Sequence, residues 1–482
     1  MINFRSIINI LGFLLLIEGL FLFSAIPVSL IYQEGDSYAF VYSGLIAILT
    51  GGISWILTRT PRLSLSKKDG YIIVTAGWML FSFVGALPFV IGGAIPSYTD
   101  AFFETMSGFT TTGASILNDI ESLSHAMLFW RSLTQWIGGM GFIVLSLAIL
   151  PLLGIGGMQL FIAEVPGPSP DKLHPRIKGT ASRLWLIYVI FTLALMVLLW
   201  LGDMNLFDAI CHSFTTMATG GYSTKQASIA YWNSPYIQYV ITLFMFIAGI
   251  NFTLSYYALH LRFGRVFKNE EFRYYLGFVL GFTFLMATIM YFSMDVSAEN
   301  SFRNSLFQVV SIMTTTGYVT ADYMKWTSVL WVMLVVLMFF GGSAGSTGGS
   351  MKIMRIVLVL KNSALELKRL IHPNAVIPVR FNKQAIDPSI VTNVLAFVSF
   401  YILIVVAGMV VMSAIGYDLD TSLGAVATCL GNIGPGIGLV GPVDSYSHIP
   451  DFGKWFLSFL MMIGRLELFT VLVLLTPEFW KK

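Results

Sequence analysis

Charged residues are scarce in this chain of 482 residues, at 11% of the total against 56% hydrophobic residues. A soluble globular protein is about a quarter charged, so this composition excludes a soluble multidomain enzyme and a disordered chain. Two cysteines, Cys211 and Cys429, are too few for a disulfide framework. The six histidines lack metal-ligand spacing to one another or to a cysteine, which argues against a zinc site.

Long apolar stretches stand where the charge is missing. About 20 apolar residues in a helix are needed to cross a bilayer core. Ten stretches qualify as spans: 7–31, 38–57, 70–95, 127–150, 181–201, 236–260, 274–293, 327–360, 389–415 and 453–476. Four further apolar stretches are too short to span, and each falls between two full spans: 100–112, 208–220, 304–316 and 421–433. The sequence therefore predicts an all-α polytopic membrane protein with ten spans.

Lysine and arginine fall mostly on one side of this threading. With the N-terminus inside, 22 of the 28 lie in inner segments, Arg465 lies within a span, and five lie outside: Arg131, Lys225, Arg303, Lys325 and Lys454. This positive-inside bias predicts that both termini are cytoplasmic. Fifteen acidic residues, Glu104 among them, are assigned to the outer side, and a mouth that negative would concentrate cations.

The four short stretches are copies of one pattern. Aligned without gaps on a final glycine, they read DAFFETMSGFTTTG (100–113), DAICHSFTTMATGG (208–221), NSLFQVVSIMTTTG (304–317) and TSLGAVATCLGNIG (421–434). Their first residues, Asp100, Asp208, Asn304 and Thr421, are types that favour a helix N-cap, so we expect each short helix to start there. A small residue, a short apolar helix and a polar run follow in every copy.

Such a helix is too short to cross the bilayer, so it must enter and leave on one side, and the polar run must line a cavity or be buried. The carbonyls of that run need a partner such as a dehydrated cation, and glycine permits the backbone angles that aim them. The C-terminus of the helix adds partial negative charge. Four connector helices with glycine C-caps are the alternative. Four copies in register, each between two spans, favour a ring of backbone oxygens around one axis.

A span, a pore helix, a TTTG-like strand and a second span, repeated four times, resemble the Trk/Ktr/HKT superfamily of potassium transporters. The resemblance covers the whole chain and is greatest to the bacterial Trk branch. An extra pair of spans (7–57) precedes the first repeat, and the segment 163–177, AEVPGPSPDKLHPRI, joins the first two repeats. The resemblance implies a homodimer in the lipid of the bacterial inner membrane, K⁺ as the transported ion, no organic cofactor, and a cytosolic ring of nucleotide-binding TrkA subunits. Nucleic acid is not an expected partner.

The resemblance assigns a potassium filter to the end of each repeat. Its residues are Thr111, Thr112 and Gly113; Thr219, Gly220 and Gly221; Thr315, Thr316 and Gly317; and Asn432, Ile433 and Gly434. Repeats one and three end in TTTG, whereas repeat two ends in ATGG and repeat four in GNIG, followed by Pro435. The filter is therefore expected to lack true fourfold symmetry, and its degree of K⁺ over Na⁺ selectivity stays open. Gly220 and Gly221 compete for the final position, and register with Asp208 favours Gly221.

The eighth span contains five glycines in nine residues, too many for a continuous helix: Gly341, Gly342, Gly345, Gly348 and Gly349. One interpretation is a helix kink. The other, which the resemblance favours, is an unwound gating loop within the membrane, below the filter. The same tract matches G-x-S-x-G around Ser343, but catalysis would need a strand–turn–helix and a nearby Asp–His pair, so no enzyme is expected.

Arg465 lies about twelve residues into the last span, with Glu467 nearby. A charge at that depth costs about 2.5–3.5 kcal/mol and normally faces protein or a cavity. A structural ion pair with Glu467 or Glu18 is one interpretation. In the other, Arg465 lines the pore beneath Gly434, tethers the gating loop and opposes cation leak, as the matching arginine of the family implies.

These features divide the chain into a leading pair of spans (1–68) and four pore repeats (69–163, 164–262, 263–383 and 384–482), the third with the broken span. The predicted function is K⁺ uptake through a gated, channel-like pore that a cytosolic nucleotide-binding subunit regulates. A cation-coupled potassium symporter and the potassium-binding subunit of a P-type pump are alternatives of the same class. A polytopic membrane enzyme would need a convergent catalytic pair at one depth, and the sequence offers none.

Overall fold

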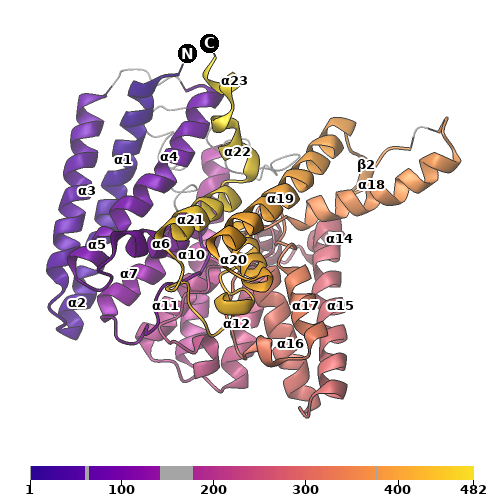
Figure 1. Cartoon of the computed structure of the whole chain (residues 1–482), viewed down its shortest axis with the longest axis horizontal. Coiled ribbons are helices and arrows are strands. Elements are labelled where there is room, and N and C mark those ends of the chain that lie inside the picture. Colours follow the sequence, from indigo (N-terminus) through magenta and orange to yellow (C-terminus); the bar gives the residue numbers. More distant parts are fainter. Residues whose placement is uncertain (1, 60–64, 142–176, 376, 482) are drawn as a thin grey trace.

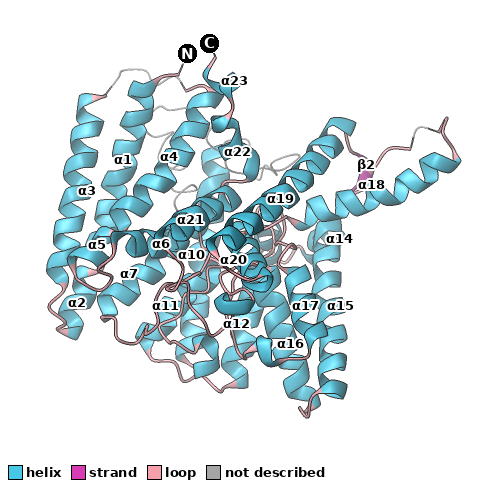
Figure 2. Ribbon diagram, viewed as in Figure 1, coloured by secondary structure: helices cyan, strands magenta, loops and turns pink. Residues whose placement is uncertain are grey.

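A computed structural model describes residues 2–59, 65–141, 177–375 and 377–481. The described part is almost wholly helical (Figures 1 and 2), and its strands are limited to a hairpin of β1 (Arg380–Phe381) and β2 (Gln384–Ala385). The predicted span 127–150 beyond residue 141, the joining segment up to residue 176, and the boundary between the first two repeats lie outside the described residues.

The leading pair of spans forms one side of the molecule, in indigo in Figure 1. It consists of α1 (Phe4–Phe23), α2 (Ile26–Tyr32) and α3 (Ser37–Leu57). The backbones of α1 and α3 approach closely at facing glycines, because a Cβ added to Gly12 would lie 2.8 Å from the carbonyl oxygen of Gly51. A Cβ on Gly51 would lie 2.6 Å from the carbonyl oxygen of Gly12. Small residues that allow such approach are typical of helix pairs in membranes.

The first two repeats follow in chain order. The first contains α4 (Lys67–Gly85), α5 (Leu87–Ile91), α6 (Tyr98–Phe109), α7 (His125–Trp136) and a π-helical turn, Ile137–Gly141. The second contains α10 (Ile177–Trp200), α11 (Leu206–Met217), a 3₁₀ turn (Ser228–Tyr231), α12 (Pro235–Ala248), α13 (Phe252–Leu259) and α14 (Phe263–Lys268).

The last two repeats keep the same order of span, pore helix and broken span. The third contains α15 (Glu270–Ser293), α16 (Ala298–Met313), a 3₁₀ turn (Tyr323–Lys325), α17 (Ser328–Leu337) and α18 (Ile353–Ile371). The fourth contains α19 (Pro388–Ile415), α20 (Leu419–Gly431), a 3₁₀ turn (Gly438–Val440), α21 (Asp451–Arg465), α22 (Leu468–Leu472), a 3₁₀ turn (Val473–Leu475) and α23 (Pro477–Trp480).

Six described helices are long and apolar enough to cross a membrane, or up to eight if each of two bent pairs is counted as one span. The predicted spans at 236–260 and 453–476 are each divided by a bend that the sequence did not indicate. The helices α12 and α13 meet at 113°, and α21 and the segment Leu468–Leu475 meet at 116°. Neither break contains a glycine run like that of the eighth span. They occur beside Asn251, whose side chain caps α13 by accepting from the Thr253 amide, and at Glu467, where φ is +61°.

The predicted N-caps of the four pore helices were wrong. The side chains that cap α6, α11, α16 and α20 belong to Ser97, Asn205, Ser297 and Asp418, three residues before the predicted cap in three repeats and seven in the third. Each true cap accepts from the amide three residues on, and in three repeats that amide belongs to the residue predicted as the cap. Asp and Thr suit both positions, so residue type alone placed the start one turn late.

Both termini lie side by side at one end of the molecule (Figure 1), where the start of α4 holds them. The Asn3 amide donates to Asp69 Oδ1 at 2.9 Å. Lys68 Nζ donates to the carbonyls of Phe479 at 2.6 Å and Lys481 at 2.9 Å. The leading pair and the last repeat are therefore fixed against the first repeat at that end.

Candidate filter and gate

The four pore helices end in the same left-handed turn. The residue that enters it has φ near +55° in every repeat: Thr111 at 54°, Thr219 at 52°, Thr315 at 60° and Asn432 at 55°. The next amide donates to the carbonyl five residues earlier, at 2.8 Å from Thr112, Gly220 and Thr316 and 2.9 Å from Ile433. This bond satisfies a terminal helix carbonyl without continuing the helix. The chain is thereby turned out of the helix in the same way four times.

We call the four residues that end each repeat's aligned segment a filter strand, although they are not part of a β-sheet: 110–113, 218–221, 314–317 and 431–434. The final glycine of each filter strand has a positive φ as well. The values are +83° at Gly113, +76° at Gly221, +78° at Gly317 and +97° at Gly434. Gly220 is absent from the positive-φ residues, so Gly221 is the residue of repeat two whose backbone matches the other three. Side chains rarely adopt this conformation, which explains why glycine recurs at these four positions.

The four strands approach one another in a closed cycle. A Cβ built on Gly113 would overlap the carbonyl oxygen of Gly220, and one on Gly221 would overlap that of Thr316. In the same sense, a Cβ on Gly317 would overlap the carbonyl oxygen of Ile433. The cycle closes where a Cβ on Gly434 would lie 2.8 Å from the carbonyl oxygen of Thr112. The residues predicted to form the filter are thus brought together, each strand beside the next around one ring.

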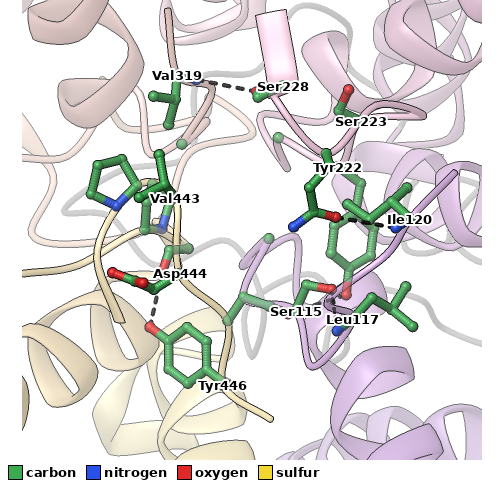
Figure 3. A pocket seen from close by; sticks show the side chains of 18 of the residues that line it. Ser115, Leu117, Ile120, Tyr222, Ser223, Ser228, Val319, Val443, Asp444 and Tyr446 are labelled. Atoms are coloured by element: carbon green, nitrogen blue, oxygen red, sulfur yellow. Dashed lines mark hydrogen bonds between the residues drawn. The ribbon is translucent and has the colours of Figure 1, made fainter. Parts of the chain in front are cut away.

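A pocket opens above this ring and is lined by all four final glycines. Ser115, Ser228, Val319 and Tyr446, one from each repeat, surround it in Figure 3. Its lining also includes Arg131, Lys225 and Asp444, so charges of both signs face it. An ion that reaches the ring from this side passes through the pocket.

Tyrosines that follow the strands connect neighbouring repeats behind the ring. Tyr222, directly after Gly221, donates from its hydroxyl to the carbonyl of Glu104 in α6 at 2.6 Å. Tyr318, directly after Gly317, contacts Thr215 in α11 through its hydroxyl and donates to the His212 carbonyl at 3.3 Å. Each of these tyrosines therefore attaches a strand to the pore helix of the preceding repeat.

A buried ion pair, which the sequence did not predict, lies beside Tyr222. Arg131 Nε donates to Glu104 Oε1 at 2.7 Å, and both residues are 2% exposed or less. The guanidinium also stands 3.6 Å from the centre of the Tyr222 ring. The sequence assigned both charges to the outer side, and a count of charges by side does not show that two of them are buried against each other.

The strands differ in how their backbones are held. Hydroxyls of Thr110 and Thr112 lie 2.8 Å apart in repeat one, and those of Thr314 and Thr316 lie 2.8 Å apart in repeat three. Repeats two and four lack such pairs. In repeat two the side chain of Gln135, on α7, donates to the Gly220 carbonyl at 2.6 Å and accepts from the Tyr222 amide at 3.0 Å. Gln135 was not among the predicted filter residues, because nothing in the sequence shows that α7 touches another repeat's strand.

The glycine tract of the eighth span is an unwound loop between α17 and α18, and it lies against the inner side of the ring. The Gly349 amide donates to Thr315 Oγ1 at 2.7 Å. Thr347 Oγ1 donates to the carbonyls of Met217 at 3.2 Å and Ala248 at 3.3 Å. A Cβ on Gly349 would lie 2.5 Å from the carbonyl oxygen of Gly431. The loop therefore touches the ends of the second, third and fourth pore helices at once.

The loop is also attached to the remaining backbone around it. The Ser343 amide donates to the Gly249 carbonyl at 2.9 Å, and the Phe252 amide donates to the Gly345 carbonyl at 3.1 Å. Gly345 has φ of +77°, which a side chain would strain. The Ser343 hydroxyl is buried without a hydrogen-bond partner among the described residues, so no base activates it there as a nucleophile would need.

Arg465 joins this loop to the first and last repeats. Its guanidinium donates to the carbonyl of Thr347 in the loop and to those of Gly138 and Gly139 in the π-helical turn, each at 2.6 Å. Glu467, one of the two acids considered as its partner, forms an ion pair with Arg355 on α18. Both oxygens of Glu18, the other acid, are buried without a hydrogen-bond partner in the described chain.

A second cation holds the loop one residue further on. Lys352, which precedes α18, donates from Nζ to the carbonyl of Gly348. From the sequence, this lysine belongs to the inner positive charges and to a basic segment on which a cytosolic ring could dock, and its bond to the loop was not predicted. Two successive loop carbonyls, those of Thr347 and Gly348, are thus bound by cationic side chains from different repeats.

Comparison with known proteins agrees with this architecture. The family model TrkH, described as a cation transport protein, matches residues 36–482. The Trk system potassium uptake protein TrkH of Salmonella typhimurium is 42% identical over 485 residues, which is 100% of both chains. The Trk system potassium uptake protein TrkG of Escherichia coli is 35% identical over 480 residues, 99% of each.

A solved structure is similar along the full length. The crystal structure of the potassium transporter TrkH from Vibrio parahaemolyticus superposes with a TM-score of 0.90, at 39% identity and 100% coverage of both chains. These relatives are named as uptake transporters, not as enzymes. The chain belongs to the TrkH family of Trk potassium-uptake transporters.

Proposed function

We propose that this protein takes up K⁺ through a gated, channel-like pore whose filter is the ring of four strands. The closed cycle of approaches between Gly113, Gly221, Gly317 and Gly434 carries the proposal. A ring of backbone oxygens of this kind can replace the hydration shell of a cation. The relatives named as potassium uptake proteins support K⁺ as that cation.

Electrostatics favour a cation at the ring. Four pore helices end there, and the partial negative charge of a helix C-terminus favours cations. All four final glycines line the outer pocket, so an ion can reach the ring from that side. In this proposal K⁺ passes through the pore without an organic cofactor and without a chemical step.

The loop at residues 341–349 acts as the gate in this proposal. It blocks the inner side of the ring through Thr347 and Gly349, and Arg465 and Lys352 hold it there. A fixed cation beside a cation path also opposes conduction by like-charge repulsion. Opening then requires the loop carbonyls to leave Arg465 and Lys352.

Regulation comes from a cytosolic ring of TrkA-type nucleotide-binding subunits, and the membrane subunit works as a homodimer in the inner membrane. The basic residues of α14, of α18 and of the loop after α18 form the surface on which such a ring would act. Both termini lie at one end of the molecule (Figure 1), which suits the predicted cytoplasmic position of both. The Arg355–Glu467 pair connects α18 to the break beside Arg465, a direct route from that surface to the gate.

The test is rescue of a bacterium that lacks potassium uptake, at sub-millimolar K⁺, with and without its TrkA-type partner. We expect growth with the partner and weak growth without it. K⁺ flux into proteoliposomes, measured without a pH gradient and without a Na⁺ gradient, separates a pore from a symporter. A pore conducts K⁺ down the K⁺ gradient alone, whereas a symporter needs the gradient of a coupling ion. A pump subunit would show no flux without its ATPase. Either of the latter results would overturn the channel-like mechanism.

A further inference from the structure

The two filter strands that depart from TTTG are held by carboxamide side chains. In repeats one and three the brace is internal, a pair of threonine hydroxyls 2.8 Å apart in each strand. Repeat two has Ala218 and Gly220 at those positions, and repeat four has Gly431 and Ile433, so neither can form the pair. An equivalent constraint has to come from outside the strand.

In repeat two Gln135 supplies that constraint. It is completely buried and bonds the backbone on both sides of Gly221: its Nε2 donates to the Gly220 carbonyl at 2.6 Å, and its Oε1 accepts from the Tyr222 amide at 3.0 Å. The Tyr222 amide can only donate, so it fixes which end of the carboxamide faces which strand atom. A Cβ on Gly220 would lie 2.5 Å from Gln135 Oε1. A threonine at position 220 and this carboxamide therefore exclude each other.

In repeat four the carboxamide belongs to the strand itself. Asn432 is completely buried, and its Nδ2 donates to Thr112 Oγ1 in repeat one and to the Met461 carbonyl in α21, both at 2.9 Å. The Met461 carbonyl can only accept, which again fixes the orientation of the amide. The neighbouring Ile433 fills the space over Gly431, where its side chain lies 3.0 Å from the position of an added Cβ. The Asn432 amide thus joins the fourth strand to the first and closes the ring.

We propose that Gln135 and Asn432 are specificity-determining positioning residues of the filter. Their amides replace the threonine hydroxyl pairs and fix the oxygens of the two divergent strands. Discrimination between K⁺ and Na⁺ depends on the number and placement of coordinating oxygens, so a strand that is free to move loses it. The inference rests on the filter proposed above and adds to it the side chains that set its selectivity.

The experiment measures the K⁺/Na⁺ permeability ratio in proteoliposomes for Gln135→Leu and Asn432→Leu. Losing one buried hydrogen-bonded brace should lower the ratio about fivefold in each variant, while K⁺ flux at saturating K⁺ persists. Gln308→Leu is the matched control. Gln308, on the pore helix α16, is completely buried like Gln135 and Asn432, but its amide donates to Thr320, outside the four strands. We expect that variant to keep the ratio within about twofold.

Isosteric variants separate the hydrogen bonds from packing and keep the test valid if leucine prevents folding. Gln135→Glu keeps an acceptor for the Tyr222 amide but places an oxygen, instead of the donating nitrogen, opposite the Gly220 carbonyl. Asn432→Asp likewise places an oxygen opposite the Met461 carbonyl. Both should lower the ratio. Ratios unchanged in the leucine variants, or in the isosteric ones where leucine variants do not fold, overturn the inference.

Gly434→Ser, measured in parallel, separates this inference from the function on which it rests, because a Cβ at Gly434 meets its nearest backbone atom at 2.8 Å and flux should persist. If Gly434→Ser changes the ratio and the carboxamide variants do not, only the roles of Gln135 and Asn432 are wrong. If Gly434→Ser also leaves the ratio unchanged, the filter assignment itself fails.

Discussion

The outer and inner halves of the proposed pore differ in how well they keep the fourfold repeat. In the outer half, four pore helices end in the same left-handed turn, with the same backbone bond and a final glycine at positive φ. In the inner half, the second spans that the structure describes in full each break in their own way. Repeat two has a 113° bend, repeat three an unwound loop between Leu337 and Ile353, and repeat four a 116° bend.

The two halves differ because coordination of an ion and gating of a pore place different requirements on the backbone. A dehydrated ion is stabilised by oxygens on all sides, so four similar strands serve it. A gate needs one element with two arrangements and something that biases it. One repeat supplies that loop, and its restraints differ from repeat to repeat: backbone bonds at Gly249 and Phe252 in the second, Lys352 in the third, and Arg465 in the fourth, which also binds the π-helical turn of the first.

The largest effect is expected from adding a side chain at the ring, because the outer half leaves no space for one. At Gly221 and Gly317 a Cβ would overlap a neighbouring backbone oxygen, and the positive φ adds about 1–2 kcal/mol of strain for a non-glycine residue. Gly221→Ala and Gly317→Ala should abolish K⁺ uptake by cells. Gly434→Ala should be milder, with higher K⁺ requirement, because its nearest atom is 2.8 Å away. Equal uptake by all three variants at normal expression would contradict the closed ring.

Removing Arg465 is expected to have the next largest effect, confined to the inner half. Arg465→Ala loses the bonds to Thr347, Gly138 and Gly139. Hydrogen bonds from a charged donor contribute about 1.5–3 kcal/mol, so basal K⁺ flux without the cytosolic partner should rise at least tenfold. Deletion of Gly345–Gly348 should also raise it. Flux is measured in proteoliposomes, with Arg465→Lys as the variant that keeps the charge. Unchanged or lower flux in both altered proteins would leave Arg465 a structural residue and the tract an unwound loop without a gating role.

Lys352 tests whether the restraint on the loop is shared. Lys352→Met keeps the length of the side chain but loses its bond to the Gly348 carbonyl. One bond from a charged donor is lost rather than three, so we expect a rise in basal flux of about tenfold, smaller than that of Arg465→Ala. Lys361→Met is the control, since Lys361 lies on the same helix but pairs with Glu270, away from the loop. A rise of the same size in the control would show that the charge of α18 matters and the bond to Gly348 does not.

The sequence predicted the symmetric half better than the asymmetric one, and for a physical reason. The four pore helices and the final glycines repeat a local requirement, a short helix followed by a positive φ, and a local requirement leaves a mark at a fixed spacing. The glycine run at 341–349 is a mark of the same kind. The bends beside Asn251 and Glu467 carry no glycine run: at the first an asparagine caps α13, and at the second Glu467 pairs with Arg355, a residue 112 positions away. Gln135 acts on a strand 85 residues away, and one sequence shows no such pairing.

The smallest effect is expected from two tyrosine hydroxyls, and it tests whether the outer half is symmetric in energy as well as in shape. Tyr222→Phe removes the bond to the Glu104 carbonyl but keeps the ring against Arg131, and Tyr318→Phe removes the matching contacts with α11. Each should lower the stability of the folded protein by about 1 kcal/mol, a shift of a few degrees at most in its thermal midpoint, with uptake nearly unchanged. Thermal unfolding of the purified proteins measures the midpoint of each variant, and uptake by cells is measured separately. Equal shifts would mean that the two positions are equivalent, whereas a much larger loss for Tyr222→Phe would show that the Glu104–Arg131 pair makes the first repeat the anchor of the ring.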